Sequence, residues 1–126
     1  MRLSEIRDLL ACEVFSAEDQ LNREAKHGCA SDLMSDVLAF SRAGAVLLTG
    51  LVNVHTVQTA YIAEINCIVF VRGKRPDESV IAVAKEKKIS LLGSSYSMYE
   101  ACGILYQHGL TSTMQCALNH TSPKRA

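Results

Sequence analysis

The second half of the chain contains short, continuous apolar runs that each stop at a glycine or a polar residue. The clearest runs are Ala45–Thr49, Cys67–Val71 and Ile89–Leu92. Strands of a parallel sheet have this composition, because helices cover both of their faces and no polar alternation is needed. The pattern therefore predicts three buried parallel strands.

Helical patterns follow each of the three runs, at about Val54–Ile65, Asp77–Lys87 and Ser97–His108. Three consecutive strand–helix units imply right-handed crossovers within one sheet. Pro76 suits the first turn of its helix, and Gly109 suits the residue just after the last helix. We therefore expect a single three-layer α/β domain with a mostly parallel sheet.

Weaker patterns occupy the first forty residues. Ser4 is a suitable N-cap for a short first helix, and Cys12–Phe15 is expected to be a first short strand. A polar connection follows, with an edge strand near Glu24–Cys29 as one option. Ser31 is then expected to cap a helix over Asp32–Ser41. The apolar stripe of that helix would consist of Leu33, Val37, Leu38 and Phe40.

Size and charge narrow the functional classes. A chain of 126 residues suits one domain. Its 13 basic side chains balance 13 acidic ones, whereas a nucleic-acid-binding domain normally has a large basic excess. No apolar run approaches the ~20 residues of a membrane span. We therefore expect neither a nucleic-acid partner nor a membrane partner.

The cysteines indicate a reducing compartment. They are odd in number, widely spaced and without a CxxC pair, at Cys12, Cys29, Cys67, Cys102 and Cys116. The N-terminal segment 1–8 is charged where a signal peptide would be apolar. Both features predict a cytoplasmic protein with free thiols.

Known catalytic motifs are missing: the sequence has no P-loop, dinucleotide fingerprint, nucleophile elbow or HExxH. His27 and Cys29 have no second ligand pair nearby, so we expect no metal. Asp32 and Asp36 have the spacing of an acid–base pair, although such a pair is more often a cap-region acid and a solvated one. Cys102 is interpreted as a core thiol. No catalytic residue and no cofactor are therefore predicted.

The residues after the three predicted strands form a candidate ligand site. The carboxyl ends of parallel strands meet at the edge where open α/β sheets bind ligands. Glycines let the backbone approach a ligand, and cationic side chains attract anions. The alternative is plain turn chemistry, because glycine and serine are ordinary residues of tight turns. The candidate residues are Thr49, Gly50, Asn53, Arg72, Gly73, Lys74, Ser94 and Ser95.

Several segments carry a family resemblance. They are Leu47–Asn53, Ile68–Asp77, Val80–Glu86 and Tyr96–Leu105. These segments resemble the DRTGG domain, most closely over 45–110, and Gly28–Phe40 resembles the entry segment of small stand-alone DRTGG proteins. The resemblance divides the chain into a DRTGG-like α/β domain, 1–110, and a polar C-terminal tail, 111–126.

The resemblance implies a small α/β domain that usually pairs as a homodimer and is related to the N-terminal part of HPr kinase. In larger proteins this domain is a non-catalytic module, and it occurs beside nucleotide-sensing CBS domains. Stand-alone members are encoded near hydrogenase or iron–sulfur components, which implies an accessory role. This chain departs from the name-giving motif: Val52–His55 replaces an Asp-Arg pair, and Arg72–Lys74 keeps only Gly73 of a Thr-Gly-Gly triplet.

Three functions fit the sequence. The first is a non-enzymatic regulatory or ligand-sensing homodimer that binds a nucleotide or another small anionic metabolite. The second is an adaptor for a redox (hydrogenase or iron–sulfur) or metabolic enzyme, using the helix region of Tyr96, Tyr99 and Tyr106. The third is an enzyme that uses Asp32, Asp36 or a cysteine. It ranks last because these groups do not form a nucleophile–base set.

Overall fold

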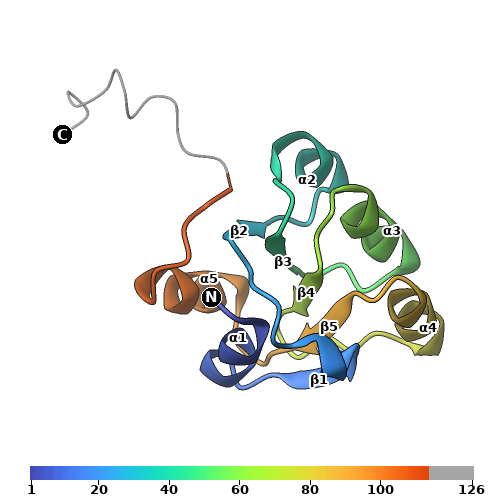
Figure 1. The fold of residues 1–126 in the computed structure, drawn as a ribbon, viewed down its shortest axis with the longest axis horizontal. Helices are drawn as coiled ribbons and strands as arrows, with labels where there is room; N and C mark the ends of the chain where they lie inside the picture. Colours follow the sequence, from blue (N-terminus) through green and yellow to red (C-terminus); the bar gives the residue numbers. More distant parts are fainter. Residues whose placement is uncertain (114–126) are drawn as a thin grey trace.

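The computed structural model describes residues 1–113, which form one α/β domain (Figure 1). Its helices are α1 (Leu3–Leu9), α2 (Met34–Phe40), α3 (Val54–Ile62), α4 (Glu78–Glu86) and α5 (Met98–Gln107), with a short 3₁₀ helix, η1 (Glu18–Gln20). Its strands are β1 (Glu13–Ser16), β2 (His27–Ala30), β3 (Ala45–Thr49), β4 (Cys67–Phe70) and β5 (Ser90–Gly93). The sheet lies between two helical layers, which confirms the predicted fold class.

The strands are arranged in the order β1-β5-β4-β3-β2. Strands β2 to β5 are parallel, and β1 pairs antiparallel with β5 at one edge. Because β2 to β5 follow one another across the sheet in chain order, right-handed crossovers place the three connecting helices on one face. Helices α2, α3 and α4 therefore cover one face, and α1 and α5 cover the other (Figure 1).

Alternating residues of the central strands fill two separate cores. Val46 and Leu48 pack on the side of α1 and α5, against residues such as Leu105. Leu47 and Phe70 pack on the opposite side, among side chains of α2, α3 and α4. Both faces of these strands are buried, which explains why their sequence shows no polar alternation.

The regular strand–helix half agrees with the prediction to within three residues. Strand β3 begins at Ala45 and ends at Thr49, as expected. Helix α3 ends at Ile62, three residues early, because Glu64 turns the chain in a left-handed conformation (φ +58°). Gly109 follows the end of α5 with φ +101°, as predicted for a glycine at that position.

Two predicted serine caps are wrong. Ser4 lies inside α1, whose N-cap is Arg2 and has no side-chain cap. Helix α2 starts two residues later than expected, with Leu33 as its N-cap. The Ser31 hydroxyl instead accepts a hydrogen bond from the Leu33 N–H (3.0 Å) in the loop before the helix. Such local bonds compete with capping, so the serine stays in the turn.

The predicted apolar stripe of α2 is also mostly wrong. Val37 is fully buried, but Leu33, Leu38 and Phe40 are about half exposed. Because the helix is short and begins at Met34, it presents Met34 and Val37 to the core. The structure therefore leaves three large apolar side chains at the surface.

Pro76 lies outside α4 rather than in its first turn. The N-cap is Asp77, whose carboxylate accepts a hydrogen bond from the Val80 N–H (3.1 Å). A carboxylate that satisfies a free N–H group is a strong start signal, so the helix begins one residue later, at Glu78.

The predicted edge strand exists as β2, at the opposite edge of the sheet from β1. Residues 111–113 pair with its outer side. The Gly28 N–H donates to the Thr111 carbonyl (2.8 Å), and the Thr113 N–H donates to the Gly28 carbonyl (3.0 Å). This pairing covers part of an otherwise open strand edge. The rest of the expected tail, 114–126, lies outside the described residues, as does Cys116.

Candidate ligand-binding site

Three loops meet where β3, β4 and β5 end. The Val71 N–H donates to the Thr49 carbonyl (3.1 Å) and links the first loop to the second. The Arg72 N–H donates to the Tyr96 carbonyl (2.8 Å), and the Gly73 N–H donates to the Ser94 carbonyl (2.8 Å). These bonds join the second loop to the third. The structure thus brings together loops that lie more than twenty residues apart in the sequence.

Asp32 follows β2, and its side chain lies beside the loop after β3. One of its carboxylate oxygens, Oδ1, accepts hydrogen bonds from the Gly50 N–H (2.7 Å) and the Thr49 hydroxyl (2.9 Å). The bond from Gly50 is the largest cause that holds the pKa of Asp32 below its ordinary value, and the bond from Thr49 acts in the same direction. Nearby Arg72 and Lys74 lower this pKa further. Asp32 is therefore an ionised acceptor at neutral pH.

Sequence reasoning missed this role of Asp32. It treated Asp32 as an acid–base candidate or a cap residue, because its nearest acidic neighbour was Asp36. The structure pairs it instead with Thr49 and Gly50, seventeen and eighteen residues away. A signal was present, since Asp32 follows a strand that ends at the same sheet edge.

Arg72 lies beside Gly50. A Cβ at position 50 would lie 2.9 Å from Nη2 of Arg72 and 3.5 Å from Oδ2 of Asp32. Only a glycine allows the Arg72 side chain to approach the backbone this closely. We call Asp32, Gly50, Arg72 and Lys74 the strand-end cluster.

The cations of this cluster are unpaired. Arg72 and Lys74 are exposed, and their side chains make no hydrogen bond or ion pair with any residue in 1–113. Arg75 differs: it forms a two-bond ion pair with Glu13, with 3.0 Å between Nη2 and Oε2. Its guanidinium also lies 5.0 Å from the centre of the Phe15 ring. Arg75 therefore connects the loop after β4 to β1, while the side chains of Arg72 and Lys74 are exposed to solvent.

Two other predicted site residues, Asn53 and Ser94, form hydrogen bonds within the protein. The Asn53 side chain caps α3 by accepting bonds from the Thr56 N–H (2.8 Å) and hydroxyl (2.9 Å). The buried Ser94 hydroxyl donates to the Leu10 carbonyl (2.9 Å) and accepts from the Tyr96 N–H (3.2 Å). Ser95 lies exposed beside them. Asn53 and Ser94 thus already have partners for their side chains.

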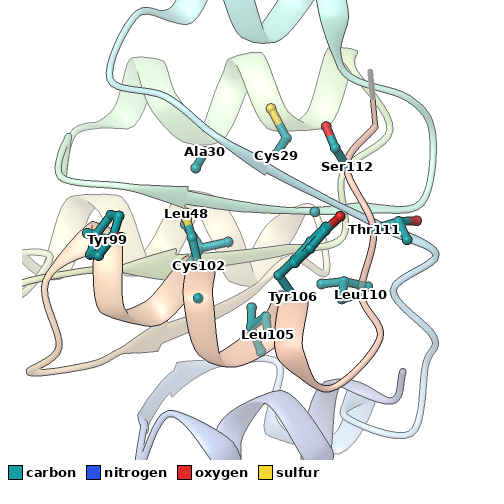
Figure 2. A pocket seen from close by; sticks show the side chains of 12 residues that line it. Cys29, Ala30, Leu48, Tyr99, Cys102, Leu105, Tyr106, Leu110, Thr111 and Ser112 are labelled. Atoms are coloured by element: carbon teal, nitrogen blue, oxygen red, sulfur yellow. The ribbon is translucent and has the colours of Figure 1, made fainter. Parts of the chain in front are cut away.

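A separate apolar hollow of about 480 Å³ lies between β2, α5 and the segment 110–112 (Figure 2). Tyr99, Cys102 and Tyr106 project from α5 into this region. Tyr99 is 89% exposed and Tyr106 is 70% exposed. The hollow therefore has an aromatic rim and no cationic side chain in its lining.

The described cysteines are all free. Burial raises the pKa of Cys12 to about 12 and also raises the pKa of Cys67. Burial also raises the pKa of Cys29 and Cys102. Raised pKa values keep these thiols protonated at neutral pH and poor as nucleophiles.

Residues 1–113 contain neither a group of metal-ligand side chains nor a membrane-length apolar helix. No three His, Cys, Asp or Glu side chains in this part of the chain lie together as metal ligands would. None of its helices has the length and apolar character needed to cross a membrane.

The fold resembles a known regulatory structure. The solved structure of the CBS and DRTGG domains of the regulatory region of Clostridium perfringens pyrophosphatase, in complex with its activator diadenosine tetraphosphate, aligns with a TM-score of 0.71. The alignment covers 99% of this chain and 61% of that one, at 15% sequence identity. At this identity the likeness shows a shared fold, as the sequence resemblance implied. No family model and no curated protein matches the chain.

Proposed function

We propose that this protein is a regulatory or ligand-sensing domain that binds a small anionic metabolite at the strand-end cluster. The observation that carries the proposal is that Arg72 and Lys74 are exposed and unpaired among the described residues, beside Gly50. The N-terminus of α3 opens at the same sheet edge, after Asn53. Exposed cations beside an accessible glycine backbone are placed to receive an anion.

Nucleotides are the first ligands to test. The structural neighbour is a regulatory region complexed with a nucleotide activator, diadenosine tetraphosphate. Such a ligand offers phosphate groups to cationic side chains, which is the chemistry that Arg72 and Lys74 suit. The shared fold therefore supports a nucleotide or another phosphate-bearing metabolite.

We propose that the domain is non-enzymatic. Two observations on the described residues support this. The pKa values of their cysteine thiols are raised, which disfavours nucleophilic attack. Asp32 directs one oxygen at the Gly50 N–H and the Thr49 hydroxyl, as a structural acceptor does.

The test is a thermal-shift titration with inorganic phosphate, AMP, ATP and diadenosine tetraphosphate. A ligand that binds only the folded state raises the stability of the protein by ~2.7 kcal/mol when the ligand concentration is a hundredfold above Kd. We expect a dose-dependent rise that is lost in Arg72→Ala and reduced in Lys74→Ala. The control is Arg42→Ala, because Arg42 is exposed just before β3, at the end of the strands away from the cluster. No shift with any of these ligands would contradict the proposal.

A second candidate function is a protein adaptor, working in the cytoplasm as a homodimer or on a redox or metabolic enzyme. The exposed Tyr99 and Tyr106 around the apolar hollow favour it, because aromatic side chains are enriched in protein interfaces. Sedimentation and affinity capture with the Tyr106→Arg variant test it. Loss of the dimer or of the captured enzyme, with the phosphate response unchanged, would support the adaptor function. A monomer without a stable partner would contradict it.

A further inference from the structure

The side of α5 that borders the apolar hollow has a gap between two exposed tyrosines. Tyr99, Gly103 and Tyr106 all line the hollow, and their spacing of four and three residues places them on one side of the helix. Nothing lies within 4 Å of a Cβ built on Gly103, so the surface between the tyrosines is open. Figure 2 shows Tyr99 and Tyr106 on either side of Cys102. A glycine inside a helix is less stable than an alanine, so helix stability does not account for this gap.

The gap has the length that a planar ring needs. The seven-residue separation of Tyr99 and Tyr106 corresponds to about 10 Å of helix, so a ring midway would lie about 5 Å from each along the helix axis. Aromatic rings pair at centroid distances of roughly 4.5–7 Å. The volume of the hollow, about 480 Å³, lies in the roughly 300–1,000 Å³ range of small-molecule pockets. The geometry therefore suits one planar aromatic ring that contacts both tyrosines.

The lining of the hollow restricts the charge of that ring. The described residues around the hollow include no Asp, Glu, Lys, Arg or His, and its sheet side includes the apolar residues Ala30 and Leu48. A charged group placed there would lose water without gaining a partner. The hollow therefore suits an uncharged ring, and any charge of the same ligand must lie outside it.

The hollow lies next to the strand-end cluster. Ala30 ends β2 and lines the hollow, and Asp32 of the cluster follows two residues later. On β3, Leu48 lines the hollow, and Gly50 of the cluster follows two residues later. Two residues of extended chain span at most ~7 Å, so both strands connect the two sites over a short distance. One small molecule with a ring at one end and an anion at the other can therefore reach both.

We propose that the apolar hollow binds the uncharged aromatic ring of the ligand whose anion binds Arg72 and Lys74. This inference rests on the proposed anion site and names its ligand class as nucleotides, which join a planar base to phosphate. A phosphate monoester carries up to two negative charges at neutral pH, which matches the two cations. Tyr99 and Tyr106 hold the base between them, over Gly103.

Calorimetric titration of the full chain with AMP, GMP, UMP, ribose 5-phosphate and inorganic phosphate tests the inference. We expect at least one nucleotide to bind about tenfold or more tightly than ribose 5-phosphate, the usual range for a base that stacks on aromatic side chains. In Tyr99→Ala and Tyr106→Ala this difference should shrink, while binding of ribose 5-phosphate stays unchanged. Both side chains are largely exposed, so the fold should be retained. Tyr61→Ala is the matched control, because Tyr61 is an exposed tyrosine of α3, on the opposite face of the sheet.

Gly103→Leu tests the gap itself. Leucine favours a helix over glycine, and its side chain would enter open space, so the fold should again be retained. The tighter binding of nucleotides should be lost, with ribose 5-phosphate still bound, because the leucine occupies the place of the ring. Undiminished nucleotide binding in this variant and in both tyrosine variants would overturn the ring site, since the base would then be recognised elsewhere.

The outcomes distinguish this inference from the proposed function. Equal binding of nucleotides, ribose 5-phosphate and inorganic phosphate, lost in Arg72→Ala, would overturn the ring site and leave the anion site standing. A dimer that dissociates in Tyr106→Ala and persists with bound nucleotide, measured by sedimentation, would also overturn the ring site, because a second copy would then cover the hollow. No binding of any of the five probes would overturn both.

Discussion

At the scale of the residue, Arg72 has an unusual backbone. Its φ of +60° lies in the left-handed region, which costs a side-chain-bearing residue roughly 1–2 kcal/mol. Of the four other non-glycine residues in 1–113 with this conformation, Ala17 precedes η1. The other three, Ala11, Glu64 and Lys88, each follow the end of a helix, where such a turn is common. Arg72 instead follows strand β4 and is held by the bond to the Tyr96 carbonyl. The fold maintains this strain where the unpaired guanidinium is presented.

Replacing Arg72 by glycine should therefore separate stability from binding. We expect Arg72→Gly to raise the free energy of unfolding by about 0.5–1 kcal/mol, since glycine adopts this conformation freely but loses more chain entropy. Phosphate binding should be lost. Lys88→Gly, at φ +57°, should raise the free energy of unfolding by a similar amount and leave phosphate binding unchanged. Urea unfolding and phosphate titration check both variants, and full binding by Arg72→Gly would show that its side chain is dispensable.

The ionisation of Asp32 gives a pH dependence with a definite sign. Its pKa is depressed in the folded protein, chiefly by the Gly50 N–H. The stability that it contributes is therefore present above the ordinary carboxyl range and is lost as the pH falls through that range, below about 4. Asp32→Asn should be less stable than the native protein at pH 7, and this difference should shrink at pH 3. Urea unfolding at both pH values checks it, and a difference that grew on acidification would refute it.

At the scale of the element, the turn from β3 to α3 needs Gly50 for the approach of Arg72. A methyl group there would lie 2.9 Å from a guanidinium nitrogen, the far end of a flexible side chain. The same turn keeps its Asn53 cap and the bonds from Thr49 and Gly50 to Asp32. A small side chain at position 50 would therefore leave the backbone of the turn in place but would displace the Arg72 side chain.

We expect Gly50→Ala to change the melting temperature by less than a few degrees, since the displaced guanidinium can move into solvent. It should weaken phosphate binding several-fold, because the methyl group displaces the Arg72 guanidinium. Gly103→Ala is the matched control: nothing lies within 4 Å of a Cβ there, and alanine favours a helix by about 0.5–1 kcal/mol. Calorimetry and a thermal melt measure both effects. Unchanged phosphate affinity in Gly50→Ala would remove Gly50 from the site.

At the scale of the whole molecule, the two cores are coupled through shared strands. Leu47 and Leu48 are neighbours on β3, yet they belong to opposite cores. The N-terminal strand β1 closes the far edge, where the Ser16 hydroxyl donates to the Ile89 carbonyl (2.7 Å) and accepts from the Leu91 N–H (3.0 Å). Neither core can unfold without removing one face of the same sheet.

We therefore expect a single cooperative unfolding transition. Far-ultraviolet circular dichroism reports helices and sheet, and the methyl signals of a proton NMR spectrum report the packing of the two apolar cores. The two urea midpoints should coincide, as they do for most single domains of this size. Separate midpoints would show that one helical layer detaches before the other.

The sequence by itself determined the parallel strand–helix half of this protein. Ala45–Thr49 matches β3 at both ends, because a strand buried on both faces must be apolar throughout. The helix starts at Asn53 and Ser97 depend on bonds to residues only three positions away. Such signals are local, so the chain carries them without its fold.

Only the tertiary structure decided the assembly of the strand-end cluster. Asp32 meets Gly50 across eighteen residues, and Arg72 takes its left-handed turn through a bond to Tyr96. The tertiary structure also decided which face of α2 is buried. Met34 and Val37 pack against the sheet, whereas most of the predicted apolar stripe does not. Contacts between distant segments depend on how strands align at one edge, and the local pattern of apolar and polar residues does not encode that alignment.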